Sequence, residues 1–331
     1  MSATVAPEQI LKELAELWVD SGKQGQSEGG TGVLRACTMT LLTLAEASED
    51  TQDLGETIAA LMPEHPARSI VVRLTGEGER ALAERVYSQC WMPFGQRRQI
   101  CCEQVEITIS DAALADLRSV VVPLTVPDLP LIIWCRSARI PQMKDFWAIA
   151  SLAQKLIMDT GSASDPVGAL MCAAATAESG IVLGDLSWTR MTRWRAMLSQ
   201  VFENQENLAQ VAKVSKVEVE WGGSRQVSAL YLGAWVRDAL LAAGVRPALQ
   251  FSQTSSSDFV RVILTGDGIQ AELVRSEDRM VVTLNGTSQC TNLPLPTDYL
   301  MMREELGLIR HDPIFEATLA SAARLAYPSE K

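Results

Sequence analysis

The chain has 331 residues, of which 47% are hydrophobic and 21% charged, and its formal net charge is −11 at pH 7. This composition excludes a disordered, fibrous or low-complexity chain, and the length favours two globular domains. The acidic balance argues against nucleic acid as a partner. Prolines break the longest apolar runs short of the roughly 18 residues of a membrane helix, so association with a membrane is not expected either.

The N-terminal segment, residues 1–32, is expected to hold one packing helix and a linker. In residues 8–19 the apolar side chains fall on one helical face, namely Ile10, Leu11, Leu14, Leu17 and Trp18. The stretch that follows, DSGKQGQSEGGTG, is polar and glycine-rich, which is typical of a linker. Because the helix carries acidic residues and no basic region before an apolar block, a secretory signal is not expected.

Residues 33–207 alternate between predicted strands and predicted helices. Strands are predicted at VLRACTMTLLTLA, SIVVRL, 101–107, 120–122, 131–134, KLIMDT and GIVLGDL. Helices are predicted at DLGETIAALM, ERALAERVYSQC, 146–154 and DPVGALMCAAAT. Strands separated by helices imply crossover connections, so an α/β domain is expected, with a mostly parallel sheet and helices on both faces.

Residues 208–331 are expected to form a smaller α+β domain. VSKVEVEW predicts a strand and ALYLGAWVRDALLAAGV a helix, and four consecutive strands follow at ALQFSQT, FVRVILTG, IQAELVR and MVVTLNG. GDG and NG favour hairpin turns because they allow positive φ. An antiparallel sheet with one packed helix is therefore expected, followed by C-terminal helices near 297–306 and 312–326.

Two glycine patterns match part of the dinucleotide-binding motif. TGEGERA, with Gly76 to Ala81, stands between a predicted strand and a predicted helix, as the motif requires. However, Glu77 and Glu79 stand where a pyrophosphate needs positive potential, and TGDGIQA, with Gly266 to Ala271, lies between strands with no helix after it. Glycine turns are the plainer interpretation of both, and no cofactor is expected.

The sequence offers no clear set of residues for metal binding or for nucleophilic catalysis. The histidines are His65 and His311 alone, and no Cys, His and carboxylate group has ligand spacing. The seven cysteines are scattered without a C-x-x-C pair, which favours reduced thiols in a cytoplasmic protein. Adjacent Cys101 and Cys102 are expected to be buried on opposite faces of a strand. The chemistry therefore favours a binding or regulatory protein over an enzyme.

The segment DLSWTRMTRWRAML, residues 185–198, gathers two tryptophans and three arginines. Trp194 begins an apolar stripe at helical spacing, and Thr192 is predicted to be the N-cap of that helix. Trp188 and Arg190 precede it, in a predicted loop after the strand GIVLGDL, where sites gather in open α/β sheets. An arginine beside a tryptophan suits a partner surface or an anionic group.

This segment resembles the D-L-A/S-W-x-R-L/M-T-P-W-R signature of the glucose-6-phosphate dehydrogenase assembly protein (OpcA) family. Five further segments resemble family motifs in the same order: VLRACTMTLLTL, HPARSIVV, ICCEQVEI, VVPLTVPDLPLIIWCR and KLIMDTGSASDP. The chain departs from the pattern at three positions, where Arg193 replaces a proline, Cys135 a second tryptophan and Thr160 a serine.

The resemblance implies a bacterial, cytoplasmic and non-catalytic partner of glucose-6-phosphate dehydrogenase, the NADP-linked entry enzyme of the oxidative pentose phosphate pathway. It implies that the chain promotes assembly or the active state of that enzyme. In some members the effect is linked to thioredoxin-controlled cysteines, although spacing identifies no pair here. The motif positions carried over as candidate partner-binding residues are His65, Arg68, Glu103, Asp128, Trp134, Asp159, Asp185, Trp188, Arg190, Trp194 and Arg195.

Two other hypotheses stay open. The chain could be a sugar-phosphate- or nucleotide-binding α/β protein, with a weak hydrolase or lactonase activity, in which Arg68, Arg190 and Arg195 meet the phosphate. Alternatively, Cys101 and Cys102 could form a redox sensor. The assembly partner is the leading hypothesis because several ordered motifs support it.

Overall fold

The structure, a computed structural model, describes residues 7–27, 33–79, 81–91, 99–203, 205–256, 260–276 and 278–327. It divides into two compact units whose segments interleave along the chain. Unit 1 consists of Met1–Met158, Ile181–Gly184 and Asp298–Arg310, and unit 2 of Asp159–Gly180, Asp185–Thr297 and His311–Lys331. The domain boundaries expected at residues 32 and 207 follow chain order, and they stay a prediction.

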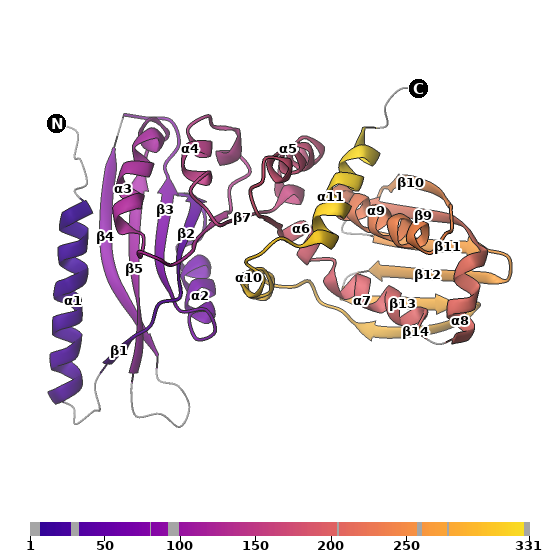
Figure 1. The fold of residues 1–331 in the computed structure, drawn as a ribbon, viewed down its shortest axis with the longest axis horizontal. Coiled ribbons are helices and arrows are strands. Elements are labelled where there is room, and N and C mark those ends of the chain that lie inside the picture. Colours follow the sequence, from indigo (N-terminus) through magenta and orange to yellow (C-terminus); the bar gives the residue numbers. More distant parts are fainter. Residues whose placement is uncertain are drawn as a thin grey trace. The chain divides into compact units, whose positions relative to one another are not determined.

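Unit 1 is built on sheet A, an eight-stranded and mostly parallel sheet (Figure 1). Its strands are β1 (Val33–Arg35), β2 (Met39–Glu46), β3 (Ala67–Leu74), β4 (Leu82–Trp91), β5 (Gln99–Ile109), β6 (Leu131–Cys135), β7 (Lys155–Met158) and β8 (Leu183–Asp185). They lie in the order β1-β5-β3-β2-β6-β7-β8, with β4 antiparallel beside β5. The chain builds outward from β2 to β5 and then restarts at β6 on the other side of β2. That reversal is the topological switch point at which open α/β sheets bind ligands.

The helices of unit 1 surround a buried sheet. They are α1 (Pro7–Ser27), α2 (Thr51–Leu61), α3 (Leu117–Leu124), α4 (Phe146–Ala150) and α10 (Asp298–Gly307), with short 3-10 turns η1 (Asp111–Asp116) and η2 (Ile140–Gln142). All eight residues of β3 are buried, which requires cover on both faces of the sheet. The predicted mostly parallel α/β fold is confirmed.

Several elements of unit 1 differ from the sequence predictions. The single strand predicted at VLRACTMTLLTLA forms two strands, β1 and β2, which lie at separate places in the sheet. From Leu82 onward the predicted helix ERALAERVYSQC is strand β4, because pairing with β5 along the strand overrides the helix propensity of its Ala, Glu and Arg residues. The predicted strand at 120–122 belongs to helix α3, and the helical period of its buried side chains was hidden by a run of valines. Helix α1 continues to Ser27, through part of the predicted linker, although glycines at 22 and 25 disfavour a helix there. The rest of that linker, residues 28–32, lies outside the described residues.

Unit 2 is built on sheet B, a six-stranded sheet. Its strands are β9 (Val214–Gly222), β10 (Ala248–Thr254), β11 (Val260–Gly266), β12 (Ile269–Ser276), β13 (Arg279–Leu284) and β14 (Thr287–Asn292). They lie in the order β10-β9-β11-β12-β13-β14. The sheet is mostly antiparallel, as predicted, but β10 pairs with β9 in parallel. The reason is that a helix crosses over between these two strands, and a crossover brings the second strand back in the same direction.

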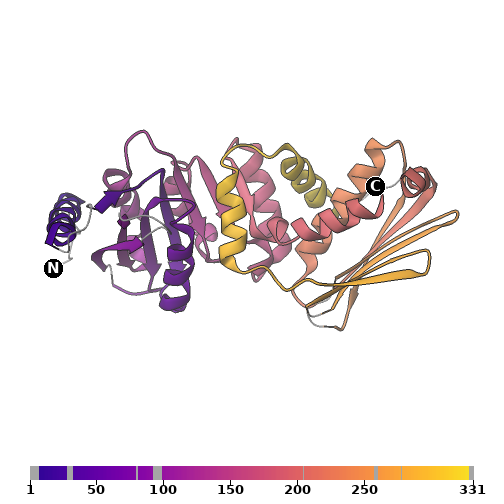
Figure 2. The same ribbon diagram turned by 90° about the horizontal axis from the view of Figure 1, so that it is seen from below.

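The helices of unit 2 lie on one face of sheet B (Figure 2). They are α5 (Pro166–Glu178), α6 (Leu186–Thr189), α7 (Thr192–Val201), α8 (Gln205–Gln210), α9 (Gln226–Ala242) and α11 (Pro313–Ala326), with 3-10 turns η3 (Thr160–Ser162) and η4 (Val211–Lys213). Apolar residues of α7, α9 and the sheet form one core, which includes Trp194, Leu232 and Leu273. Across the described ranges, none of the helices in either unit has the length and apolar character that membrane crossing needs.

Candidate functional site

The signature segment begins where β8 ends, at a carboxylate that joins three elements. Asp185 is the last residue of β8, and its Oδ1 accepts hydrogen bonds from the backbone N–H of Ser187 at 2.9 Å and of Thr160 at 3.2 Å. Its Oδ2 accepts the Thr160 hydroxyl at 2.5 Å and the Tyr231 hydroxyl at 2.7 Å. Asp185 thereby ties η3, α6 and α9 together inside unit 2.

The Asp185 carboxyl is fully buried, and this changes its acidity. Burial raises its pKa to about 6, the nearby Asp159 carboxylate adds to the rise, and the hydrogen bonds from Thr160, Tyr231 and Ser187 oppose it. Burial likewise raises the pKa of Tyr231, and the Asp185 charge beside it has the same effect. Since the chain itself supplies donors to both carboxylate oxygens, the buried group is satisfied internally.

Asp159 and Arg190 form an ion pair beside this network. Asp159 directly follows β7, and its Oδ2 lies 2.7 Å from Nη2 of Arg190, while its Oδ1 accepts the Ser187 hydroxyl at 2.6 Å. Burial acts to raise the pKa of Asp159, but the charge and hydrogen bonds of Arg190, together with hydrogen bonds from Ser187 and the Gly161 backbone, outweigh it, so the pKa is lowered. The side chains are 17% and 16% exposed, which leaves the pair in reach of solvent.

Trp188 and Arg195 stack on each other within the same unit. The guanidinium carbon of Arg195 lies 3.4 Å from the Trp188 ring centroid, and Nη1 donates to the Trp188 carbonyl oxygen at 2.8 Å. The Trp188 ring also contacts Tyr231 and Phe315, with centroids 5.8 and 5.9 Å away. Trp188 is 5% exposed and belongs to helix α6, so the loop position predicted for it is corrected.

The remaining part of the signature is helix α7. Trp194 is 4% exposed and packs into the core of sheet B, as its apolar stripe predicts. The N-cap is Met191, because the helix begins one residue earlier than predicted, at Thr192. The Thr192 hydroxyl instead accepts a hydrogen bond from Arg195 at 3.0 Å. Arg193, where the family pattern has proline, is exposed.

A second group of motif residues meets in unit 1, around Glu103. This carboxylate is 3% exposed and lies 2.5 Å from Nε of Arg68 and 2.8 Å from Nη2 of Arg35. It also accepts the Trp18 indole N–H at 2.6 Å, which fastens helix α1 to strand β5. Arg68 donates further to the Leu124 carbonyl oxygen at 2.7 Å. Glu103 and Arg68 therefore act in holding unit 1 together.

The other three motif positions of unit 1 lie apart from this group. Trp134 is buried in β6, and the Arg136 guanidinium carbon lies 4.8 Å from its ring centroid. His65 is half-buried between α2 and β3, where its backbone N–H donates to Leu61. Asp128 is exposed and has a φ of 63°, which is the left-handed conformation of a turn residue.

The pocket at the topological switch point is lined by carboxylate side chains, which do not suit a phosphate. A pocket of about 350 Å³ lies at the carboxyl ends of β2 and β3, lined by Glu46, Ala47, Ser48, Leu74, Thr75, Gly76, Glu77, Asp111 and Arg139. Arg139 pairs with both Glu46 and Asp111. Gly76 has a φ of 88°, and strand β4, not a helix, follows it. The positive φ of Gly76 and the strand after it fit a glycine turn better than the strand-to-helix turn of the dinucleotide motif.

The cysteines include both disulfide-bonded and free side chains. Cys101 is disulfide-bonded, which corrects the expectation that the thiols are all reduced. Cys102 is free and buried, and burial raises its pKa to about 11, which lowers its reactivity. Among the described residues, no three His, Cys, Asp or Glu side chains come together as metal ligands.

Sequence reasoning missed the groups that surround Asp185. Tyr231 and Phe315 come from helices distant in sequence, and only their apolar helical pattern could be read in advance. Thr160 carried a signal, because it stands where the family pattern has serine and keeps the hydroxyl that bonds Asp185. The structure thus brings together Asp159, Asp185, Trp188, Arg190 and Arg195 in unit 2, and Arg68 and Glu103 in unit 1.

Two family models match the chain in succession. One, described as the glucose-6-phosphate dehydrogenase subunit N-terminal domain, matches residues 58–175, and the other, the C-terminal domain of that subunit, matches 181–319. Curated relatives from Synechocystis and Nostoc punctiforme carry the provisional name OxPP cycle protein OpcA. Both are 24% identical to this chain, over 190 and 180 residues, or 56% and 53% of it. Those matches cover 39% and 38% of the relatives' own length.

Solved structures with a similar arrangement are oxidoreductases. A Gfo/Idh/MocA family oxidoreductase from Vibrio cholerae has a TM-score of 0.43 and 9% identity, with 86% of this chain and 95% of that chain covered. A dehydrogenase (MviM) from Clostridium difficile has a TM-score of 0.42 and 8% identity, with 87% and 97% covered. Likeness at this level carries no conclusion about activity. The two family models, by contrast, match well over half of the residues, and the chain belongs to the OpcA family of glucose-6-phosphate dehydrogenase assembly proteins.

Proposed function

We propose that the chain binds glucose-6-phosphate dehydrogenase and biases it towards its assembled or active state, without contributing chemistry of its own. The observation that carries this proposal is the match of two successive family models named for that dehydrogenase. The names of the curated relatives support a role in the oxidative pentose phosphate pathway. A cytoplasmic location belongs to the same proposal.

The geometry of the signature segment supports a binding role. Asp185 and Asp159 are held by donors from the chain itself, and Trp188 lies between Arg195 and two aromatic rings. A catalytic carboxylate must reach a substrate proton, whereas the fully buried Asp185 reaches only its own neighbours. We infer that the signature gives unit 2 its shape, and that the dehydrogenase recognises the resulting surface.

The phosphate-binding alternative draws no support from these contacts. Arg68 pairs with Glu103, Arg190 pairs with Asp159, and Arg195 bonds Trp188 and Thr192. The pocket at the switch point is lined by three carboxylates, and the arginine beside them is already paired. Each of these guanidinium groups already has internal hydrogen-bond partners, so we do not adopt this alternative.

Activation by binding requires a difference in affinity between two states of the dehydrogenase. A tenfold preference for the active state corresponds to about 1.4 kcal/mol and shifts the population tenfold. The assay is steady-state kinetics of the dehydrogenase from the same organism, with and without the purified chain. We expect a higher kcat or a lower KM for glucose 6-phosphate. Unchanged kinetics and an unchanged oligomeric state of the dehydrogenase at saturating chain would refute the proposal.

A further inference from the structure

Strand β14 is the last strand at one edge of sheet B. Its sequence, TSQCTN, holds no charge and no proline, and all six residues are exposed. It pairs with β13 in unbroken register from Leu284 and Thr287 to Arg279 and Asn292. In the described part of the chain, no strand pairs with its outer side. Natural proteins usually protect such edges with lysines, prolines or bulges, because the open backbone groups are a template for another strand.

The hairpin turn fixes which backbone groups face outward. Asn285 and Gly286 both have positive φ, at 49° and 85°, as in the two-residue type I′ turn. Such a turn is closed by a hydrogen-bonded pair, and the pairs then alternate along the hairpin. The N–H and C=O groups of Ser288, Cys290 and Asn292 therefore point away from β13, available to an added strand.

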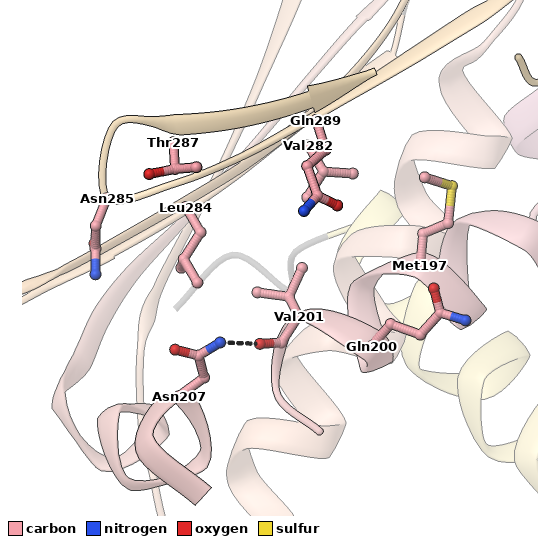
Figure 3. Close-up of a pocket in the computed structure, with 9 residues that line it drawn as sticks. All are labelled: Met197, Gln200, Val201, Asn207, Val282, Leu284, Asn285, Thr287 and Gln289. Carbon is pink, nitrogen blue, oxygen red and sulfur yellow. Dashed lines mark hydrogen bonds between the residues drawn. The ribbon is translucent and has the colours of Figure 1, made fainter. Parts of the chain in front are cut away.

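An uncharged groove lies beside this edge, on the helix side of sheet B (Figure 3). Its volume is about 450 Å³, and it is lined by Met197, Gln200, Val201, Asn207, Val282, Leu284, Asn285, Thr287 and Gln289. The apolar side chains offer a surface for burial, while the amides offer donors and acceptors. None of the lining residues is charged, although the chain carries a net charge of −11.

We propose that β14 binds an extended, uncharged segment of the partner protein by strand addition. This rests on the proposed function, which makes the partner glucose-6-phosphate dehydrogenase. Side chains alternate along an added strand, so every second one would face the groove and the others the open face of the sheet. The groove has no charged lining residue, so it favours an uncharged segment, since a charge placed there would be buried without a counter-ion.

The groove also favours a partner segment over a second copy of this chain. If two copies of β14 paired, each would present Thr287, Gln289 and Thr291 to the helix side of the other. Those polar side chains could bond the amides of the groove, but they would bury little apolar area against Met197 and Val282. A segment with an apolar residue at every second position matches it and buries more apolar area.

The test compares C290P with C290A, in the full chain, by titration with the dehydrogenase. Proline removes the outward N–H of residue 290, which β13 does not use, and is tolerated on an edge strand. Alanine removes the same thiol and keeps that N–H. We expect C290P to weaken binding about tenfold or more and C290A about twofold or less. Hydrogen exchange on the complex should show new protection at the amides of 288, 290 and 292.

A second pair of variants tests the groove. Q289K places a cation at the groove, whereas S288K places the same cation on the open face of the sheet. We expect Q289K to weaken binding about tenfold and S288K much less. Unchanged binding in C290P and Q289K, with no new protection, overturns strand addition and leaves the proposed function standing. The absence of any complex with the unaltered chain refutes both. Self-association that C290P abolishes makes the occupant a second copy and overturns the inference.

Discussion

Asp185→Asn should change how the stability of unit 2 depends on pH. Burial raises the pKa of Asp185 from its ordinary 3.8 to about 6. The folded state therefore holds a proton more tightly than the unfolded state, and stability falls as pH rises from about 4 to about 6. The pKa of Asp185 differs by about two units between the folded and unfolded states. Each unit corresponds to about 1.4 kcal/mol, so the loss in the free energy of unfolding is ~3 kcal/mol. Asparagine does not titrate, so D185N should lack this loss.

Asparagine can keep the hydrogen-bond partners of Asp185 without carrying its charge. Its carbonyl oxygen can keep the two backbone N–H donors of Thr160 and Ser187, which cannot reorient. Its amide then faces the hydroxyls of Thr160 and Tyr231, and each hydroxyl can turn to accept. We therefore expect D185N to lower the free energy of unfolding by only about 1 kcal/mol below pH 4.5. As pH rises, the stability of D185N should increase relative to that of the unaltered chain.

The assay is urea unfolding of the unaltered chain and D185N from pH 4 to pH 8. The matched control is D267N, which neutralises an exposed carboxylate in the turn between β11 and β12. The difference in free energy of unfolding between D185N and the unaltered chain should grow by about 2–3 kcal/mol between pH 4 and pH 6.5 and then stay level. A constant difference across this range would refute the account of a buried, titrating Asp185.

Three more substitutions have outcomes that follow from the surroundings of one side chain. E103A leaves the buried Arg68 guanidinium without its carboxylate and should lower the free energy of unfolding by about 3–5 kcal/mol in a urea titration, while a loss under 1 kcal/mol would contradict a buried pair. G184A puts a methyl group against the Glu305 carboxylate, and we expect a loss of about 1–3 kcal/mol in the same assay. The added methyl of G55A, in helix α2, meets no atom within 4 Å beyond its chain neighbours and the backbone of its own helix, and should raise stability by about 0.5–1 kcal/mol, so destabilisation there would contradict the packing around that helix.

The alternation of strands and helices predicted the α/β fold because crossover connections leave a strong local pattern. The exceptions have physical reasons. The segment that forms β4 has helix-forming residues, and only pairing with β5 makes it a strand. Strand β14 has no apolar alternation, because all six of its residues are exposed at the edge of the sheet. The parallel pairing of β10 follows from a crossover and not from its own residues.

The candidate site was predictable as a set of residues but not as an arrangement. The signature letters marked Asp185, Trp188, Arg190 and Arg195, yet nothing local to them predicts that Trp188 is buried. That burial depends on Tyr231 and Phe315, which arrive from α9 and α11. A pattern in one stretch of sequence cannot report contacts made by helices that lie far along the chain.

The central claim is that this chain and glucose-6-phosphate dehydrogenase form a specific complex. The most direct measurement is light scattering coupled to size-exclusion chromatography, applied to the purified chain, the dehydrogenase from the same organism, and an equimolar mixture of the two. We predict that the mixture gives a peak with a mass greater than that of either protein alone and containing both. Two peaks at the masses of the separate proteins, at concentrations where the kinetic effect is sought, would contradict the claim.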